Sequence, residues 1–269
     1  MFQMPKNTMH VHPDFQPLIR AIGLTPEGIF TSTKIVPWRV LPDRENCTLD
    51  VEFEGKPLRL HVKRYKPQRG YKSPAEIEFM GMAALAYEKI PSAPLICWGK
   101  MMDGRSFVVL QHLEGYTPSD KLVENGFPFD TLLMPTADLA AKLHMRGLHH
   151  RDLYLCHFLA KTDGPEIDLR LIDAARVARL TSIFTRGRWI IKDLAQLWYS
   201  TTKLPVTDAQ RDAWIKRYAE QRGLPGYAGL KTAILRKVAR IARHDSHLNQ
   251  SQPTRNISIP TETASNVDQ

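Results

Sequence analysis

One polar stretch, residues 147–158, constrains the fold of this chain more than any other part of the sequence. It reads Gly-Leu-His-His-Arg-Asp-Leu-Tyr-Leu-Cys-His-Phe and lies between a run of helical periodicity, residues 130–145, and an apolar segment that predicts a strand. It contains Asp152 and His157, and a second carboxylate, Asp173, ends the next apolar run. The pattern therefore predicts two carboxylates at the ends of two strands, with a potential metal ligand between them in the sequence.

Two carboxylates in such positions are what phosphoryl transfer from ATP requires. Asp152 would orient an acceptor hydroxyl and take its proton, and Asp173 would hold Mg²⁺ (or Mn²⁺) against the phosphates. His157 stands where protein kinases carry an asparagine, so we expect it to bind the metal or a phosphate. Each residue also has a structural alternative: a chance match for Asp152, a turn or helix cap for Asp173, and a core histidine for His157.

The preceding part of the chain predicts an antiparallel meander of three strands, at residues 35–41, 47–53 and 58–65. In the third strand Lys63 follows Val62, so the two side chains point to opposite faces of the sheet. Lys63 then lies on the polar face, where it could reach the phosphates of a nucleotide. A solvated strand lysine is the alternative.

A helix with a clear start signal follows the meander and offers Lys63 a carboxylate partner. Ser73 fits the N-cap, Pro74 the first helical position, and Glu76 the acidic position of a capping box. Glu78 points to a different face of the helix from Glu76 and is not used by the cap. We therefore expect Glu78 to be the partner of Lys63.

The loop between the first two strands departs from a usual nucleotide-binding pattern, because it contains no glycine. Residues 41–46 read Leu-Pro-Asp-Arg-Glu-Asn. Backbone amides of this loop, with help from Arg44, would have to surround the phosphates.

Further along, Asp193 in the apolar run 189–194 is expected to be a buried carboxylate. We assign it a structural role, in which it supports the backbone of residues 147–158.

Three segments together resemble the lipopolysaccharide kinase family, the Kdo/WaaP-like enzymes that phosphorylate heptose in the lipopolysaccharide inner core. They are residues 149–158, residues 171–176 (Leu-Ile-Asp-Ala-Ala-Arg) and residues 188–200 (Arg-Trp-Ile-Ile-Lys-Asp-Leu-Ala-Gln-Leu-Trp-Tyr-Ser). The resemblance extends in order over about residues 35–222, and a histidine at position 157 is typical of that family.

The resemblance implies an α+β, protein-kinase-like fold with two lobes: a small antiparallel β lobe with one helix, and a larger, mostly helical lobe. It also implies ATP, a divalent cation and a sugar hydroxyl as acceptor. Carried over by position, Asp152 is the catalytic base, and Asp173 and His157 are metal or phosphate ligands. Lys63 binds phosphate, with Glu78 as its partner. The acceptor of that family is attached to a lipid at the cytoplasmic face of the inner membrane.

These patterns divide the chain into four parts. We expect an N-terminal leader (residues 1–34), a nucleotide-binding lobe (35–112), a catalytic and acceptor-binding lobe (113–248) and a disordered tail (249–269).

The formal net charge of +9 suggests an anionic partner: a glycolipid or sugar acceptor, an anionic membrane surface, or an acidic protein. A solvated basic surface is the alternative. A helix expected at residues 230–243 has an apolar and a basic face, so it could rest on anionic headgroups or pack its apolar face internally. Arginines that could bind acceptor phosphates follow Asp173, at Arg176, Arg179, Arg186 and Arg188.

Other features narrow the cellular setting. No apolar run reaches the roughly 18 residues of a membrane span, and the first residues lack the apolar core of a signal peptide. The three cysteines lie far apart, which is typical of a reducing compartment. We expect a cytoplasmic protein, peripheral on the inner membrane. Nucleic acid is not an expected partner, because zinc-finger spacing and an aromatic-interleaved basic ribbon are both missing.

The leading hypothesis is an ATP-dependent kinase for a sugar hydroxyl, a heptose, of the lipopolysaccharide inner core or of a similar anionic glycolipid. One alternative is a kinase-like protein that acts on another hydroxyl acceptor. The other is a catalytically weak pseudokinase scaffold, which the glycine-free loop favours and the retention of Lys63, Asp152 and Asp173 opposes.

Overall fold

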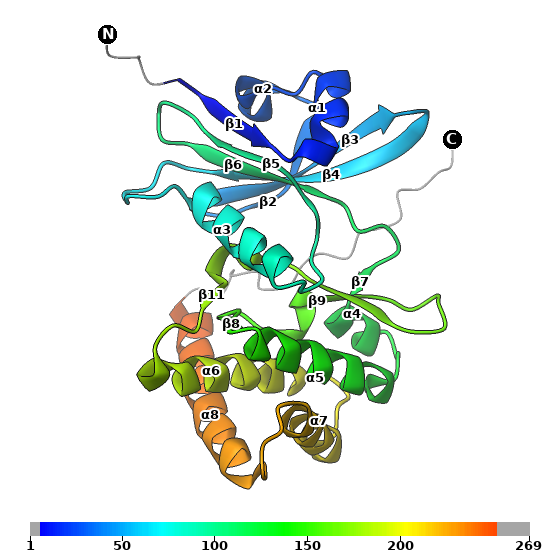
Figure 1. Ribbon diagram of the computed structural model, residues 1–269, viewed down its shortest axis with the longest axis vertical. Helices are drawn as coiled ribbons and strands as arrows, with labels where there is room; N and C mark the ends of the chain where they lie inside the picture. The colour runs from blue at the N-terminus through cyan, green and yellow to red at the C-terminus, as the bar shows by residue number, and fades with distance from the viewer. Residues whose placement is uncertain (1–5, 252–269) are drawn as a thin grey trace. The chain divides into compact units, whose positions relative to one another are not determined.

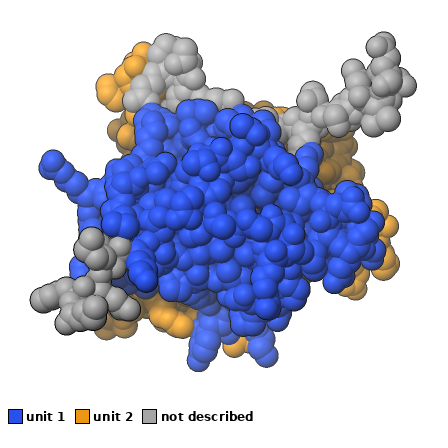
Figure 2. Space-filling model, turned by 90° about the horizontal axis from the view of Figure 1, so that it is seen from above, with its two compact units in different colours: residues 1–114, 173–177 blue, residues 115–172, 178–269 orange. Residues whose placement is uncertain are grey.

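The structure, a computed structural model, describes residues 6–251 of the chain. It has the expected α+β class, with an antiparallel sheet and separate helices (Figure 1). The chain divides into two compact units, coloured separately in Figure 2. Unit 1 consists of residues 1–114 together with residues 173–177, and unit 2 of residues 115–172 and 178–269. The tail expected from residue 249 lies outside the described residues from residue 252 onward.

Unit 1 is built on one antiparallel sheet of six strands, in the order β1-β5-β6-β4-β3-β2. The strands are β1 (Thr8–Val11), β2 (Ile35–Val40), β3 (Arg44–Phe53), β4 (Lys56–Tyr65), β5 (Leu95–Lys100) and β6 (Ser106–Gln111). The expected three-strand meander is present as β2, β3 and β4. Lys63 lies in the middle of the sheet, because β4 pairs with β3 on one side and β6 on the other.

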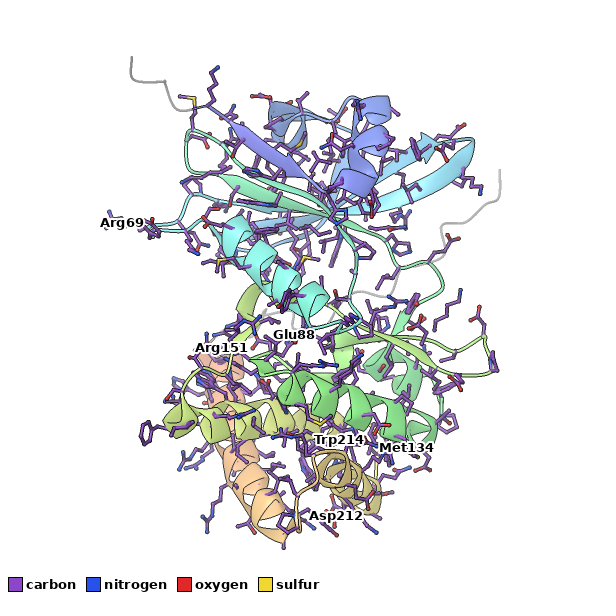
Figure 3. All side chains as sticks on the ribbon, viewed as in Figure 1. Arg69, Glu88, Met134, Arg151, Asp212 and Trp214 are labelled. Atoms are coloured by element: carbon purple, nitrogen blue, oxygen red, sulfur yellow. The ribbon has the colours of Figure 1, made fainter. Side chains whose placement is uncertain are left out.

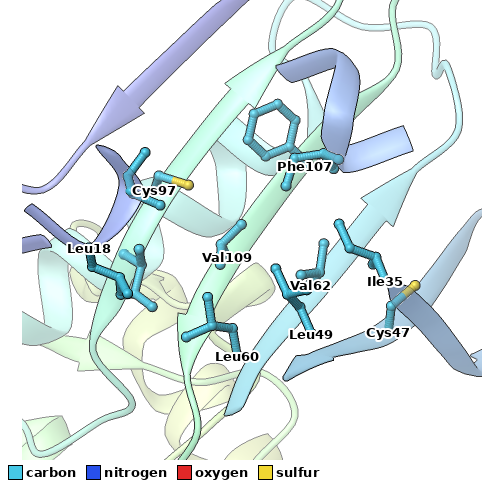
Figure 4. Packing of buried hydrophobic residues seen from close by; sticks show 12 residues of the cluster. Leu18, Ile35, Cys47, Leu49, Leu60, Val62, Cys97, Phe107 and Val109 are labelled. Carbon is cyan, nitrogen blue, oxygen red and sulfur yellow. The ribbon is translucent and has the colours of Figure 1, made fainter. Parts of the chain in front are cut away.

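Alternation along β4 separates the two faces of this sheet. Leu60 and Val62 are fully buried in an apolar core that β3, β5 and β6 also line (Figure 4). Helices α1 (Gln16–Ile22) and α2 (Pro26–Thr31) cover this face, and both contribute core residues. Lys63 points to the opposite face.

Residues 8–31, expected to be a leader, are instead part of the fold of unit 1. The backbone of β1 pairs with β5, and Leu18, Ile19 and Ile29 are buried in the core. Between β1 and α1 lies the short 3₁₀ helix η1 (Pro13–Phe15). Without these residues one apolar face of the sheet would be exposed to water, so they are needed to complete the core.

Helix α3 (Pro74–Tyr87) packs on the Lys63 face of the sheet. Its N-cap is Ser73, as the sequence predicts, because the Ser73 hydroxyl accepts a hydrogen bond from the amide of Glu76 at 3.2 Å. On another side of α3, Gly81 permits a close backbone approach: a Cβ there would lie 2.1 Å from the carbonyl oxygen of Ala174. This contact joins the 3₁₀ helix η3 (Ala174–Arg176) to α3 and makes residues 173–177 part of unit 1.

Unit 2 is mostly helical. Its helices are α4 (Ser119–Glu124), α5 (Phe129–Met145), α6 (Ile183–Thr201), α7 (Asp208–Gln221) and α8 (Ala228–Ser251). Strands β7 (Thr117–Pro118), β9 (Phe158–Lys161) and β10 (Asp168–Leu171) form a small sheet, and β8 (Leu148–His149) pairs with β11 (Ala178–Arg179). The 3₁₀ helix η2 (Leu155–His157) lies just before β9.

Within unit 2, α5 packs against α7, and α8 packs against α6. In Figure 3 Trp214 marks α7, and its indole nitrogen donates to the hydroxyl of Thr136 on α5 at 3.0 Å. On α8, Ile234 is fully buried, so the apolar face of this helix packs internally. Within residues 6–251, no helix is long and apolar enough to cross a membrane.

Candidate functional site

Lys63, Glu78 and Asp173 form a charged cluster in unit 1. The ammonium nitrogen of Lys63 lies 2.6 Å from Oε1 of Glu78 and 3.1 Å from Oδ1 of Asp173. Glu78 is almost fully buried, with 1% of its side chain exposed, whereas Lys63 and Asp173 retain 16% and 30%. The expected ion pair between β4 and α3 is therefore present, and Asp173 approaches the same lysine.

The cluster keeps Lys63 charged. Burial lowers the pKa of Lys63, but the carboxylates of Asp173 and Glu78 more than compensate and hold that pKa above its ordinary value. Tyr65, two residues along β4, donates its hydroxyl to the second carboxylate oxygen of Glu78. Burial and the negative charge of Glu78 raise the pKa of Tyr65, so it stays a donor. Glu78 is thus held from both sides, and its position fixes Lys63.

Arg44 brings a second cation into the field of this cluster. Burial lowers the pKa of Arg44, but Asp173 and Tyr65 raise it, with smaller contributions from Asp43 and Glu78. One guanidinium nitrogen lies 3.2 Å from Oδ2 of Asp43, and the buried Nε has no hydrogen-bond partner among the described residues. The glycine-free loop therefore places an arginine where an anionic ligand would gain from its charge.

Asp173 itself adopts a strained backbone conformation. Its φ of 61° lies in the left-handed region, which residues other than glycine rarely occupy. Such conformations persist where the surroundings impose them and are frequent in active sites. Here the next residue, Ala174, approaches Gly81 closely and the Asp173 carboxylate pairs with Lys63, so the backbone and the side chain are both restrained.

In unit 2, Asp193 of α6 holds the backbone of the loop that carries Asp152. Its two carboxylate oxygens accept hydrogen bonds from the amides of His150, at 2.7 Å, and Arg151, at 2.8 Å. His144 adds a contact of 3.3 Å to Oδ2. Burial raises the pKa of Asp193, but the hydrogen bonds and the nearby histidines lower it by more. The pKa therefore lies below its ordinary value, and the carboxylate stays ionised.

Three more side chains of α6, which the sequence did not reveal, bind the same loop. Gln196 lies between the loop backbone and Asp152: its carbonyl accepts from the amide of Leu153 and its NH₂ donates to Oδ1 of Asp152, both at 3.3 Å. Lys192 donates to the carbonyl of Arg151 at 2.6 Å, and Ser200 accepts from the amide of Leu155 at 2.9 Å. Their spacing of four residues places them on one helix face, and this spacing is the signal that could have identified them.

The backbone carbonyl of Asp152, five residues earlier in the motif, holds the ring of His157. Its Nδ1 lies 2.6 Å from the carbonyl oxygen of Asp152. Because a carbonyl only accepts, Nδ1 carries the proton, and a neutral ring then has its lone pair on Nε2. This is the tautomer of a histidine that binds a metal through Nε2.

The chemistry of the donors is compatible with Mg²⁺. Within residues 6–251, no three His, Cys, Asp or Glu side chains gather as a metal site. Mg²⁺ does not require one, because it commonly takes one or two carboxylates together with waters and substrate phosphates. Asp173 can supply such a carboxylate, and a cation of this kind would be held in large part by the nucleotide.

The four arginines expected to bind the acceptor are divided between the two units. Arg176 belongs to η3 in unit 1, whereas Arg179, Arg186 and Arg188 belong to unit 2. Arg188 lies over the ring of Trp189, 5.3 Å from its centroid, and Arg151 (labelled in Figure 3) lies over the same ring at 4.2 Å. Trp189 therefore gathers cations beside the Asp152 loop.

Comparison with known proteins places these residues in a family context. A sequence model described as "Lipopolysaccharide kinase (Kdo/WaaP) family" matches residues 78–218, just over half of the chain. A protein of Pseudomonas aeruginosa named lipopolysaccharide core heptose(I) kinase WaaP is 34% identical over 91 residues, which are 32% of this chain and 33% of that protein. A protein of the same name from Escherichia coli strain K12 is 38% identical over 87 residues, 31% of each chain. The chain thus spans about a third of the length of the curated relatives it matches.

Proposed function

Because the chain belongs to the lipopolysaccharide kinase (Kdo/WaaP) family, we propose that it transfers the γ-phosphate of ATP to a sugar hydroxyl, a heptose, of the lipopolysaccharide inner core or a similar anionic glycolipid. The observation that carries this proposal is the cluster of Lys63, Glu78 and Asp173. Three ionisable groups from distant parts of the chain meet there, as a phosphate- and cation-binding site needs. The names of the relatives agree with the proposed acceptor.

In this proposal unit 1 binds the nucleotide. Lys63 offsets charge on the α- and β-phosphates and is held in place by Glu78, which Tyr65 orients in turn. Arg44 helps to bind the phosphates in place of the glycine-rich loop that this chain lacks, because a guanidinium can bind a phosphate through two hydrogen bonds. Asp173, with Nε2 of His157 as a further ligand, would hold Mg²⁺ or Mn²⁺, which would supply positive charge to the phosphates when bound.

Asp152 is the proposed catalytic base. The acceptor oxygen bonds to the γ-phosphorus while the bond from that phosphorus to the ADP oxygen breaks, and the hydroxyl proton passes to the Asp152 carboxylate. Gln196 supports this role, since its hydrogen bond to Oδ1 of Asp152 restrains the carboxylate. Asp193 supports it indirectly by holding the amides of His150 and Arg151.

We further propose that the acceptor is bound through its negative charges and is met at a membrane surface. The arginines that follow Asp173 would bind its anionic groups: Arg176, Arg179, Arg186 and Arg188. A lipid-linked acceptor would bring the protein to the cytoplasmic face of the inner membrane as a peripheral protein.

The test is a transfer assay with ATP and a panel of core oligosaccharides, in which wild type is compared with Asp152→Asn. Removing a general base should lower transfer by about 10²-fold or more while nucleotide affinity stays the same. Unchanged turnover in Asp152→Asn would remove this residue as the base. If wild type transferred phosphate to none of the sugars but did transfer it to another alcohol, the proposed sugar acceptor would be wrong.

The absence of glycine from residues 41–46 favours a second candidate function, that of a pseudokinase scaffold. The same experiment separates the two, because a scaffold would bind nucleotide weakly or not at all and would transfer no phosphate to any acceptor. The cluster around Lys63 opposes this reading, because Asp173 joins the structural pair of Lys63 and Glu78 and keeps 30% of its side chain exposed, as a cation ligand requires.

A further inference from the structure

Two large apolar side chains stand almost fully in solvent at the start of α6. Ile183 is 79% exposed and Phe184 is 91% exposed. Single exposed apolar residues are common. A phenylalanine beside an isoleucine, both almost fully exposed, instead places a substantial continuous apolar area in contact with water. The pair is therefore a candidate for contact with another apolar phase.

All the charged residues in the sequence around this pair are cationic. From residue 174 to residue 192 there are five arginines or lysines and no aspartate or glutamate. Arg179, Arg186 and Arg188 are exposed. The first turn of α6 contains no acidic residue, although the positive end of the helix dipole favours one there. An external anion would relieve this concentration of positive charge.

The segment is joined to the Asp152 loop by backbone hydrogen bonds. Strand β11 pairs with β8, so that Ala178 lies opposite His149, and the amide of Leu180 donates to the carbonyl of Gly147 at 2.7 Å. The exposed pair follows three residues after Leu180. Whatever binds the pair is thus held close, along the chain and through these bonds, to the loop that carries the proposed base.

We propose that residues 179–188, here called the α6 entry segment, dock the protein onto an anionic lipid bilayer. Ile183 and Phe184 insert among the lipid headgroups, and Arg179, Arg186 and Arg188 bind phosphates at the membrane surface, those of the lipid-linked acceptor included. This inference rests on the proposed function, because a lipid-linked acceptor requires an enzyme at the membrane surface. It assigns that contact to a segment beside the catalytic loop.

Two observations favour a bilayer over a protein partner. Protein interfaces concentrate their binding energy in packed pockets, whereas side chains exposed to 79% and 91% protrude from their surroundings, which suits a fluid apolar phase. The charge is also complementary to anionic headgroups over the whole segment. Helix α8 is a weaker candidate for this contact, because its apolar face packs against α6 and Ile234 is buried.

Sedimentation with lipid vesicles tests the docking directly. Vesicles of phosphatidylcholine with phosphatidylglycerol are compared with vesicles of phosphatidylcholine alone. The variant Ile183→Ser/Phe184→Ser should bind the anionic vesicles about tenfold less tightly than wild type, because it loses the inserting side chains. The matched control is Met134→Ser/Met145→Ser, which removes two half-exposed apolar side chains from α5 (Met134 is labelled in Figure 3) and should bind like wild type.

A second variant, Arg186→Gln/Arg188→Gln, tests the electrostatic part. It should bind more weakly at low salt and lose part of the salt dependence of wild type. Equal binding of all variants, or equal binding to neutral and anionic vesicles, would overturn the proposal. So would wild type that ignores both vesicles but binds an acidic protein through this segment.

A transfer assay in two formats separates this inference from the proposed function. Ile183→Ser/Phe184→Ser should phosphorylate a soluble, lipid-free core oligosaccharide as wild type does, and should lose activity on the same acceptor presented in anionic vesicles. Loss in both formats would overturn the docking role and give the pair a role in the reaction. If wild type itself transfers to no sugar while vesicle binding follows the segment, the docking stands and the proposed function fails.

Discussion

Lys63 lies between two carboxylates that are 15 and 110 residues away from it in the sequence. The closer partner, Glu78, is buried to 1% exposure, and a buried charge that loses its counterion is strongly destabilising. The lysine therefore contributes to the stability of unit 1 as well as to its proposed function.

We expect Lys63→Met to lower the free energy of unfolding by about 3 kcal/mol, because among the described residues the Glu78 carboxylate would keep the hydrogen bond from Tyr65 alone. Urea unfolding measures this change. The control is Arg59→Met, in the same strand, whose ion pair with Asp50 is largely exposed and should be worth less than about 1 kcal/mol. Equal losses in the two variants would show that Lys63 makes no special contribution.

A second residue-scale prediction concerns pH. Burial lowers the pKa of His149 from 6.5 to about 4; Asp193 opposes this shift, and Arg151 adds to it. The folded protein therefore keeps the imidazole neutral at pH values where the unfolded chain binds a proton. Its contribution to stability is complete above about pH 6.5 and is lost as the pH falls towards 4.

We expect the free energy of unfolding of wild type to fall between these pH values by roughly 2 kcal/mol more than that of His149→Gln. Denaturant titrations at several pH values measure the difference. His247→Gln, at an exposed position of α8, serves as the control and should follow wild type. Parallel pH profiles for wild type and His149→Gln would exclude the protonation of this histidine as a cause.

At the scale of elements, α3 and α6 have comparable tasks. Helix α3 fixes Lys63 through Glu78 and contacts the segment after Asp173 through Gly81. Helix α6 fixes the Asp152 loop through a face of polar residues. In each unit, one helix thus positions the proposed chemistry.

The contact at Gly81 gives a prediction for α3. In Gly81→Ala a Cβ would lie 2.1 Å from the carbonyl oxygen of Ala174, and backbone atoms cannot move aside cheaply. We expect a loss of about 1 to 3 kcal/mol in stability from this overpacking, and weaker nucleotide binding as Asp173 shifts from Lys63. Thermal unfolding and nucleotide titration measure the two effects.

Gly229→Ala is the matched control for this variant. Gly229 is also helical, in α8, but a Cβ there meets nothing within 4 Å. Alanine should stabilise that helix by up to about 1 kcal/mol. If Gly81→Ala behaved in the same way, the contact between α3 and η3 would not constrain Asp173.

The pairing of Lys63 with Glu78 was predictable because it rested on local rules, whereas the contact of Lys63 with Asp173, 110 residues away, was not. Alternation placed Lys63 on the polar face, and the Ser73 cap accounted for Glu76, which left Glu78. The spacing of Gln196 and Ser200 indicates a shared helix face, but their partners do not follow from it, since these depend on which loop packs against α6. Their roles in phosphate transfer, like those of the other site residues, stay predictions that the assays above test.

The prediction of an N-terminal leader at residues 1–34 is wrong for a related reason. Strand β1 has only four residues, and α1 and α2 have seven and six, which are too short for a clear periodicity. These elements form because they cover the apolar face of a sheet, and β5, the strand that pairs with β1, comes about 85 residues later in the chain. Tertiary burial, rather than local propensity, decided these elements.

At the scale of the whole molecule, the chain leaves unit 1 after residue 114 and returns to it for residues 173–177. Synthesis on the ribosome therefore cannot finish unit 1 first, although its sheet and α3 are complete much earlier. Until the ribosome has released residue 177, Gly81 faces no Ala174 and Lys63 pairs with Glu78 alone. A nascent chain that ends just before residue 173 contains every strand of the β-sheet of unit 1 and α3 but not Asp173, so the proposed cation site can be assembled only after most of unit 2 preceding α6 has been made.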